Sequence, residues 1–552
     1  MPKGVLTVDE MTFEKAMRFA TAFAGRPEGS SRLIRLEDEL AYPVLCAAAL
    51  LGRFKKLRGF EKQRLLAGLV KAGVRNEEDL RAWIGNIYSR VHKNKWDSSR
   101  KRADEFLSAG IRVMAPEASC GGAVGRPLPP ADLPECPGIL FAKGCPSAPP
   151  PLLAVFNSRK PRLVSPLSSW LEGLRSSLGA LEHGKIALAG STGTLTYDLA
   201  SVFAHRFGFL QLLVAPFPLT ETEPHFHRLF GEKAADIPVI SCALCGAPCP
   251  AKLPLKCRDR LLAWLSDLHL VLEIRSGGNL LAVLEELQTR SPRPRLVMKP
   301  EGTGSGNGGN RILLRKFPKH TVGFNPPGQH QPARSKSFAP ANFSPSSGLH
   351  VTRINEVALR DYLFHYTRAC GGPWPGQTYR QYLLELLEPD GLPGRSAFDT
   401  LLRIAAEGLL RAHCRMVRGR TAVVCWSSLH PKELSLIRKW RPGLARWTVE
   451  PYGVALRRDL LRSLGAKPAI YGSAQSYSKL PESERFRFQL SGRGSSAGWR
   501  HEREWRSAGD LALGDIRPGQ GFYFVRSAGE AERFYDRVEP GLPVLAINGH
   551  NF

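Results

Sequence analysis

Glycine and hydroxyl residues gather in this sequence at the ends of apolar runs. The run Leu270–Ile274 leads into Arg275–Gly278, and the run Arg295–Met298 is followed by Gly302–Asn310. Glycine lets backbone amides approach a phosphate closely, and the start of a following helix adds partial positive charge. These residue types therefore predict a binding site for a nucleotide or for nucleic-acid phosphates.

Two earlier segments have the same form. The run Leu152–Phe156 ends in Asn157–Lys160, and Ile186–Ala189 ends in Gly190–Thr194. Because ligands bind at the carboxyl ends of parallel strands, we expect these loops to share one site. Tight strand-to-helix turns are the alternative use of the same glycines. The predicted phosphate-binding residues are Ser158, Arg159, Gly190, Ser191, Thr192, Gly193, Arg275, Ser276, Gly277, Gly278, Gly302 and Gly304.

The elements that must position these loops alternate in type. Helical spacing over Leu167–Leu178 and Leu280–Gln288 separates the apolar runs, and a further run, Leu210–Ala215, follows the second loop. Strands that alternate with helices predict a doubly wound, Rossmann-like α/β domain with a parallel sheet.

The order of these motifs resembles that of a known family. The chain carries, in sequence, GIRV, LPECPGILFAKG, NSRKP, GSTGT, RSGGN and KPEGTGSGNGGN. This order resembles the DNA-processing protein A (DprA/Smf) family of the SLOG superfamily, over roughly residues 101–316. The family's Gly-Ser-Arg loop is matched by Ser158 and Arg159 but not by Asn157. The resemblance implies phosphate-binding loops and single-stranded DNA as the partner.

The same superfamily includes the Lonely-Guy-type phosphoribohydrolases, which need a helix-borne glutamate facing a ribose. Here Leu284 occupies the glutamate position and Glu285 follows it. One residue on a helix turns a side chain by about 100°. The sequence therefore favours binding over hydrolysis at this site.

Bulk composition is consistent with a polyanionic partner. The 77 Lys and Arg residues against 50 Asp and Glu give a net charge of +27. Such an excess favours DNA or RNA, although a solvated basic surface is the alternative. The amino terminus lacks a signal-peptide core, and the longest apolar stretch, Tyr42–Gly52, is too short for a bilayer. We expect a cytoplasmic protein without a membrane partner, and the composition is compatible with an oligomer.

An insertion at about residues 220–257 holds a cluster of thiols. It contains Cys242, Cys245 and Cys249, with Cys257 further on. Thiolates at Cys-x-x-Cys spacing bind zinc, so the cluster predicts a zinc site. Buried, reduced cysteines are the alternative.

A composition change divides the chain. Residues 317–350 are rich in Pro, Ser, Gly and Asn, which is typical of a linker. We therefore expect a helical region over residues 1–100, the α/β domain over 101–316, and a separate α+β domain over 351–552.

The carboxyl-terminal domain carries a second resemblance. A predicted strand bearing His365 and Thr367, followed by the segment LLRIAAEGLL, resembles ADP-ribosyltransferase-fold proteins, especially the DNA-modifying toxin branch. The resemblance implies NAD as cofactor, with His365, Thr367 and a late glutamate, Glu502 or Glu504, as catalytic residues. Such a glutamate holds the ribose 2′-hydroxyl and stabilises an oxocarbenium-like transition state. The alternatives are a histidine bonded to backbone and a salt bridge from Glu504 to Arg506.

Two functions follow. The first is a DprA-like platform that binds nucleic acid or a nucleotide, fused to an NAD-dependent ADP-ribosyltransferase-like effector, as in bacterial phage defence. The second is a non-enzymatic single-stranded-DNA-binding factor in which Arg159, Arg275 and Lys299 contact phosphates and the carboxyl-terminal domain serves for docking.

Overall fold

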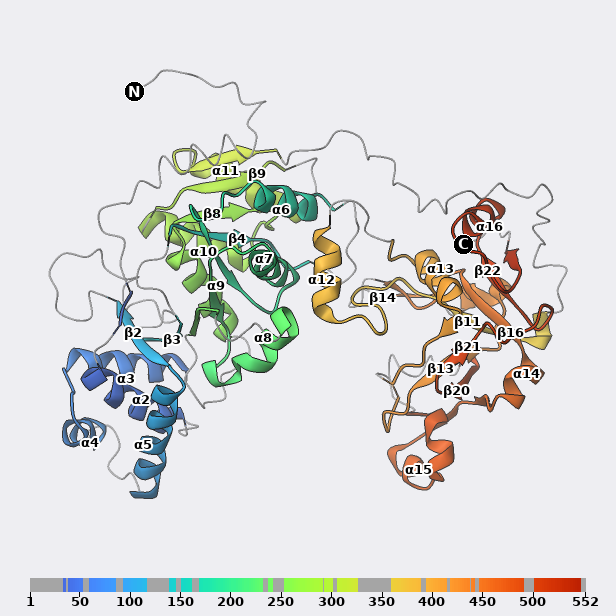
Figure 1. The fold of residues 1–552 in the computed structure, drawn as a ribbon, viewed down its shortest axis with the longest axis horizontal. Coiled ribbons are helices and arrows are strands. Elements are labelled where there is room, and N and C mark those ends of the chain that lie inside the picture. Colours follow the sequence, from blue (N-terminus) through green and yellow to red (C-terminus); the bar gives the residue numbers. More distant parts are fainter. Residues whose placement is uncertain are drawn as a thin grey trace, which may run out of the picture. The chain divides into compact units, whose positions relative to one another are not determined.

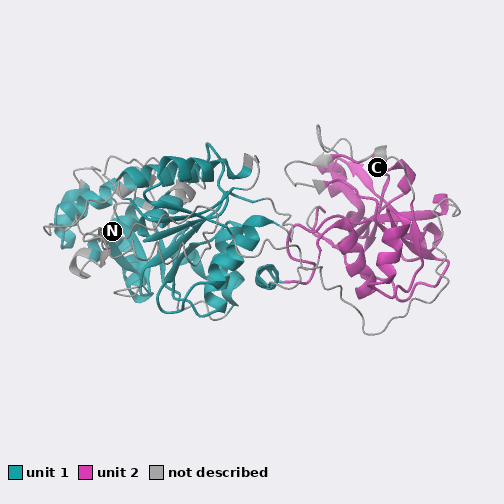
Figure 2. Cartoon of the chain, turned by 90° about the horizontal axis from the view of Figure 1, so that it is seen from above, with its two compact units in different colours: residues 1–160, 167–331, 378–389 teal, residues 161–166, 332–377, 390–552 magenta. Residues whose placement is uncertain are grey.

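The chain forms two compact units (Figure 2). Unit 1 comprises residues 1–160, 167–331 and 378–389, and unit 2 comprises residues 161–166, 332–377 and 390–552. The computed structural model describes residues 33–35, 38–52, 59–85, 93–116, 139–144, 150–160, 168–231, 237–241, 253–290, 292–300, 305–325, 359–388, 394–414, 417–436, 438–441, 446–490 and 501–547.

A ten-stranded sheet forms the centre of unit 1 (Figure 1). Its strands are β1 (Leu33–Arg35), β2 (Arg112–Pro116), β3 (Leu140–Lys143), β4 (Leu152–Phe156), β5 (Ala187–Ser191), β6 (Gln211–Ala215), β7 (Val239–Ser241), β8 (Leu268–Val271), β9 (Arg295–Met298) and β10 (Thr321–Phe324). The order is β1-β2-β3-β7-β6-β5-β4-β8-β9-β10. All pairs from β7 to β10 are parallel, and β1, β2 and β3 extend the sheet antiparallel.

The strand order defines where a ligand should bind. The chain starts the parallel part in the middle at β4, proceeds outward to β7, and then crosses back to β8 beside β4. This is the order of a Rossmann-type doubly wound sheet, and its direction reverses between β4 and β8. The predicted fold class is confirmed, and the reversal of strand order lies between β4 and β8, whose carboxyl ends share one edge of the sheet.

Helices cover the two faces of the sheet. They are α6 (Ser169–Gly179), α7 (Leu195–Arg206), α8 (Thr222–Phe230), α9 (Leu253–Leu265), α10 (Asn279–Arg290) and α11 (Gly308–Lys316). Right-handed crossovers on either side of the reversal put the first three on one face and the last three on the other.

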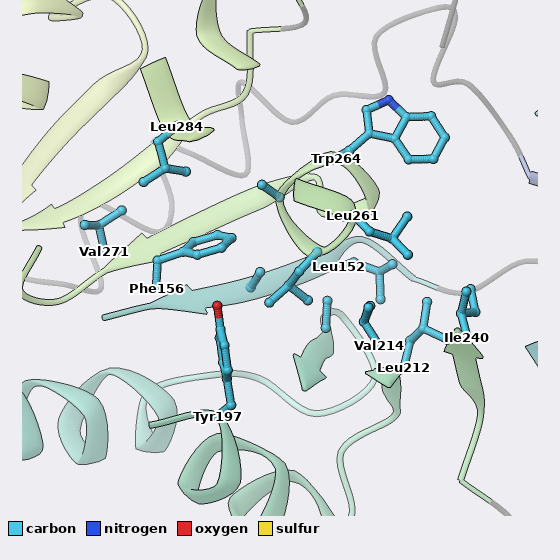
Figure 3. Close-up of a cluster of buried hydrophobic side chains, with 14 of the residues drawn as sticks. Leu152, Phe156, Tyr197, Leu212, Val214, Ile240, Leu261, Trp264, Val271 and Leu284 are labelled. Atoms are coloured by element: carbon cyan, nitrogen blue, oxygen red, sulfur yellow. The ribbon is translucent and has the colours of Figure 1, made fainter. Parts of the chain in front are cut away.

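The central strands are buried on both faces. Every residue of β4, β5, β8 and β9 is buried, which explains why they read as continuous apolar runs rather than as alternating patterns. Figure 3 shows Leu152 and Phe156 of β4 among side chains from α9, β6 and β8. This packing makes β4 the best-anchored strand of the site.

The amino-terminal part of unit 1 is helical, as expected. It contains α2 (Asp38–Gly52), α3 (Gly59–Lys71), α4 (Glu77–Gly85) and α5 (Lys93–Ser108). The largely apolar α2 packs against α3 and α5, with Leu45 and Leu50 fully buried. The helical pattern of the sequence also predicts a helix over Met11–Phe23, which lies outside the described residues. Within the described ranges, no helix combines the length and apolar character of a bilayer span.

Two segments of unit 1 differ from expectation. The strand β10 lies inside the predicted linker and pairs in parallel with β9. The expected loop Gly302–Asn310 is shorter, because Gly308 already begins α11. Glycine normally destabilises a helix interior. At Gly308 and Gly309, however, the close packing of α11 against the residues that follow β8 requires glycine.

Unit 2 is a separate, mainly antiparallel α+β domain. The sheet order is β17-β20-β13-β11-β16-β22-β23, and only β22 and β23 pair in parallel. The strands are β11 (Tyr362–Tyr366), β13 (Val423–Ser427), β16 (Gly453–Arg457), β17 (Lys467–Pro468), β20 (Glu504–Ala508), β22 (Gly521–Val525) and β23 (Val544–Ala546). The helix α13 (Ala397–Glu407) begins with a Ser396 capping box and ends at Gly408, whose φ of 59° suits glycine.

One helix is out of place in the sequence. The segment α12 (Tyr379–Leu387) lies between β11 and α13, which belong to unit 2, yet it is part of unit 1 and packs on α7 and α8. This helix is not among the predicted elements.

A buried histidine at β8 has a consequence for acid stability. His269 is fully buried, and its ring stands edge-on to Phe156 with centroids 5.2 Å apart. Its Nε2 lies 2.9 Å from the carbonyl of Ala263, which only accepts, so Nε2 carries the proton. Burial, assisted by the charge of Arg295, lowers the pKa of His269 to about 3.

We expect His269 to cost unit 1 about 2 kcal/mol of stability between pH 7 and pH 5, because the unfolded imidazole titrates near ~6.5. Between that value and about 3 the unfolded state binds more protons, so stability is complete above the unfolded pKa and falls as the pH decreases. The loss of stability is measured by hydrogen exchange of β8 peptides over a series of urea concentrations at each pH. His269→Gln should abolish the loss of stability at low pH, whereas substitution of the exposed His183, His183→Gln, should leave it unchanged. Equal losses in the wild type and in His269→Gln would contradict the role of His269.

Candidate functional site

The loops after β4 and β8 are joined directly. The backbone N–H of Ser158 donates to the carbonyl of Glu273 (2.8 Å), and the N–H of Arg275 donates to Oγ of Ser158 (3.0 Å). Arg159 and Arg275 are exposed at this junction. Two cationic side chains and the exposed residue Ser276 therefore lie where the strand order of the sheet reverses.

An ion pair fixes the base of these loops. The Lys160 ammonium pairs with Glu273, and Ser169 Oγ donates to the other carboxylate oxygen of Glu273 (2.6 Å). Burial lowers the pKa of Lys160, and the Glu273 carboxylate opposes that shift. Both groups are engaged with each other, so they position the loops and leave ligand contacts to Arg159 and Arg275.

Asn310 ties the start of α11 to the ends of β8 and β9. Its side-chain oxygen accepts from the N–H of Ile274 (2.9 Å), and its Nδ2 donates to the carbonyls of Leu272 (2.5 Å) and Met298 (2.8 Å). The side chain is fully buried. Asn310 is not among the predicted site residues, although it stands at the end of a glycine-rich run.

The glycines of α11 permit this close packing. A Cβ on Gly309 would lie 2.9 Å from the carbonyl oxygens of Ile274 and Arg275. Gly308 lies against Ser276 in the same way, with a Cβ contact of 3.1 Å. The predicted residues Gly302 and Gly304 lie outside the described residues, so their part in the site stays a prediction.

The loop after β5 offers less than expected. Gly190 and Ser191 are buried residues of β5, and the Ser191 hydroxyl donates to the carbonyl of Val214 (2.6 Å). Thr192 is also buried, and its carbonyl accepts from Arg258 (3.0 Å). Gly193 alone among the four predicted residues is exposed. The other three position the loop, because strand pairing and the α9 contact use their polar groups.

Gly193 has a distinctive conformation and partner. Its φ of 92° is a value that favours glycine, and its N–H donates to Oδ1 of Asp198 in the first turn of α7 (3.1 Å). Asn157 Nδ2 donates to Thr196 Oγ1 (3.0 Å), which links the β4 loop to the same turn. The structure thus places Ser158, Thr192 and Gly278 on one edge of the sheet.

No carboxylate in the described part of α10 faces this edge. Leu284 is fully buried, and Glu285 pairs with Lys316 (2.9 Å).

The cysteine cluster lies largely outside the described residues. Cys242, Cys245 and Cys249 are among the undescribed residues, and Cys257 is a half-buried residue of α9. Among the residues that the structure describes, no group of three or more potential ligands could hold a metal. Zinc stays a prediction.

In unit 2, His365 lies where two strands meet. β11 and β13 share one registered pair, Phe364 with Ser427. The Nδ1 of His365 lies 2.9 Å from the carbonyl of Cys425, so Nδ1 carries a proton when the ring is neutral. Burial lowers the pKa of His365 to about 4. The ring is therefore neutral at physiological pH, and its Nε2 is an acceptor.

Glu504 is the better placed of the two late glutamates. It receives two hydrogen bonds from Arg506, Nε to Oε1 (2.9 Å) and Nη2 to Oε2 (3.2 Å). Arg506 also donates to the carbonyl of Phe488 (2.8 Å) and to Oε1 of Gln489 (2.6 Å). The salt bridge considered as an alternative is present, but it is nearly buried rather than on the surface.

The remaining predicted catalytic residues have structural contacts. Glu502 precedes β20, and its carbonyl accepts from Ser427 Oγ (2.5 Å). Thr367 is buried, and its hydroxyl donates to the carbonyl of Ala397 (2.8 Å). The structure does not bring His365 and Glu504 together. Paired residues share a face, so Glu504 lies on the face of Ser427 and Phe364, and His365 lies with Trp426 on the opposite face.

The fold and loops of unit 1 define a Rossmann-type doubly wound α/β protein. Among solved structures, the chain is similar to DNA processing protein A of Streptococcus pneumoniae, with a TM-score of 0.31 and 17% identity over 56% of this chain and 93% of that chain. It is also similar to DNA processing protein A of Helicobacter pylori, described for its single-stranded DNA binding mode, with a TM-score of 0.27 and 17% identity over 34% and 81%. No protein-family model and no curated protein matches the sequence.

Proposed function

We propose that unit 1 binds single-stranded DNA through the edge where the loops after β4, β5 and β8 meet. The observation that carries the proposal is the junction at Ser158, which sets two strand-end loops side by side at the reversal of the sheet. Ligands of open α/β sheets bind at this position. The exposed Arg159 and Arg275 supply charge for phosphates, and the chain's net charge of +27 favours encounter with a polyanion.

A nucleotide ligand is the alternative occupant of the same edge. Its phosphates would use the same two arginines and the same backbone amides. The two ligands differ in salt dependence, because a strand releases many counterions and a mononucleotide few. Competition by a mononucleotide against a labelled oligonucleotide separates them.

We expect Arg275→Ala to weaken binding of a labelled oligothymidylate about tenfold, since a charge-assisted hydrogen bond contributes roughly 1.5–3 kcal/mol. The slope of log affinity against log salt should also decrease by about 0.7, the value for one phosphate on a single strand. Fluorescence anisotropy over a salt series measures both quantities.

Arg206→Ala is the matched control. Arg206 is exposed at the carboxyl end of α7, and therefore at the opposite edge of the sheet from the loops. The control should bind as the wild type does. Binding that is absent at low salt, insensitive to salt, or equally weakened by both substitutions would remove the proposal.

For unit 2 we propose an NAD-dependent, ADP-ribosyltransferase-like activity at the junction of β11, β13 and β20. Support comes from Glu504, which Arg506 orients. His365 lies on the opposite face of the sheet and reaches β13 only at the carbonyl of Cys425, so the proposed ribose contact rests on Glu504. A carboxylate has about four acceptor positions. Arg506 uses two of those on Glu504 and the Cys425 thiol also bonds to this carboxylate, which leaves about one position for a ribose 2′-hydroxyl. Cleavage of the glycosidic bond would release nicotinamide, with Glu504 stabilising the positive charge that develops on the ribose.

We expect Glu504→Gln to reduce nicotinamide release by at least about 100-fold, the usual effect of removing transition-state charge stabilisation. The assay supplies NAD with and without single-stranded DNA and measures nicotinamide by chromatography. Glu532→Gln, an exposed glutamate of α16 (Ala528–Tyr535), is the control. Absence of release under every condition, or an unchanged rate in a folded Glu504→Gln protein, would refute the activity. A role in bacterial phage defence depends on both units acting as proposed.

A further inference from the structure

The helix α12 is the clearest feature that the proposed function leaves unexplained. It presents Tyr382, Leu383 and Leu386 as buried side chains and packs on α7 and α8 (Figure 1). Arg175 Nε of α6 donates to the carbonyl of Leu386 (2.8 Å), which satisfies one backbone group at the carboxyl end of α12. α12 is thus docked on unit 1 by both apolar and polar contacts.

The amino-terminal end of α12 reaches a buried carboxylate. The Tyr379 hydroxyl donates to Oδ2 of Asp198 (2.8 Å), and the Arg228 guanidinium stacks over the Tyr379 ring at 4.0 Å. Asp198 is 7% exposed. Burial raises the pKa of Asp198, and the hydrogen bonds from Tyr379 and Gly193 and the charge of Arg228 oppose that shift. The hydrogen bonds from Tyr379 and Gly193 therefore help to keep the buried Asp198 carboxyl group ionised.

The second donor to Asp198 belongs to the candidate ligand edge. The N–H of Gly193 donates to Oδ1 of Asp198 (3.1 Å), while Tyr379 occupies Oδ2. One carboxylate thus joins the exposed loop after β5 to the docked helix. The Gly193 amide has one hydrogen, so it can serve Asp198 or an incoming anion but not both.

We propose that α12 is an intramolecular clasp, and that its docking and anion binding at the Gly193 loop compete through Asp198. This inference rests on the proposed phosphate site. A phosphate that takes the Gly193 amide removes one donor from Asp198 and places a second negative charge nearby. Both changes favour the neutral, protonated form of the buried Asp198, and a neutral carboxyl group is a weaker acceptor for the Tyr379 hydroxyl. By linkage a released α12 strengthens phosphate binding by the same factor.

The position of α12 in the sequence connects this coupling to unit 2. In the sequence, α12 lies between β11, which carries His365, and α13, and both of these elements belong to unit 2. Release of α12 would free the chain on either side of it. Occupancy of the ligand edge in unit 1 therefore has a covalent route to the segment that follows His365.

Hydrogen exchange of the full chain tests the clasp without any ligand. Tyr379→Phe keeps the ring and removes the hydroxyl, and we expect about tenfold faster exchange both in α12 and in the peptide spanning residues 190–198. The control Tyr362→Phe removes a hydroxyl that donates to the carbonyl of Gly519 (3.4 Å) and should change neither. Faster exchange in α12 with an unchanged loop would overturn the proposal.

Addition of oligothymidylate separates the clasp from the proposed function. At concentrations where anisotropy shows saturated binding, α12 should exchange about tenfold faster, and Tyr379→Phe should bind about tenfold more tightly than the wild type. Saturated binding with unchanged α12 exchange overturns the clasp and leaves the DNA site standing. Absent binding, together with coupled exchange in Tyr379→Phe, supports the clasp and refutes the DNA proposal.

Discussion

Replacement of Asn310 by leucine should destabilise unit 1 by about 4 kcal/mol, because three buried backbone groups lose their partners at roughly 1–3 kcal/mol each. Those groups are the N–H of Ile274 and the carbonyls of Leu272 and Met298. Leucine has nearly the same volume, so lost hydrogen bonds rather than a cavity account for the effect. The loop that carries Arg275 begins at these groups, and DNA binding should fall with stability.

Urea-dependent hydrogen exchange of peptides from β8 and β9 measures this change within unit 1. The control Asn94→Leu introduces the same side chain on an exposed position of α5 and should shift stability by less than about 0.5 kcal/mol. A loss below about 1 kcal/mol in Asn310→Leu would contradict the role assigned to the asparagine.

Gly309→Ala should also destabilise unit 1 and weaken DNA binding. Alanine normally stabilises a helix interior, relative to glycine, by up to about 1 kcal/mol. The added Cβ would meet two backbone carbonyls, those of Ile274 and Arg275, at 2.9 Å. Backbone atoms cannot rotate away, so α11 or the β8 loop must move. Such overpacking costs roughly 1–3 kcal/mol, and displacement of the Arg275 loop should weaken DNA binding more than tenfold.

Gly306→Ala provides the matched comparison. Nothing lies within 4 Å of a Cβ at Gly306, and its φ is not positive. The same substitution three residues earlier should therefore leave stability and binding close to wild type. If Gly309→Ala and Gly306→Ala behave alike, close packing of α11 against the ligand edge is not what requires the glycine.

Much of the parallel sheet could be predicted because its strands are buried on both faces. Leu152–Phe156 and Arg295–Met298 were predicted with the observed bounds, since fully buried strands read as apolar runs. β10 was missed because two of its four residues are only half buried and its neighbours have the composition of a linker. Short antiparallel strands such as β1 depend on partners far away in the chain.

The sequence locates the strand-end loops of the candidate site but not their contacts. Loop composition located Ser158 and Arg275, whereas the burial of Ser191 follows from where β5 ends, which differs by two residues from the prediction. Asn310 and Asp198 act through partners distant in sequence, so local patterns reveal neither their burial nor the groups they bind. The same holds for α12, whose docking on unit 1 depends on surfaces that appear only after the sheet has formed.

The most direct test of the central claim is photocrosslinking of the full chain to an oligonucleotide carrying 4-thiothymidine, followed by mass spectrometry. If the loops after β4, β5 and β8 form one binding edge, crosslinks should fall together in peptides containing Arg159, Gly193 and Arg275. Crosslinks confined to the helices α2 to α5 or to unit 2, with these three loops unmodified, would contradict it.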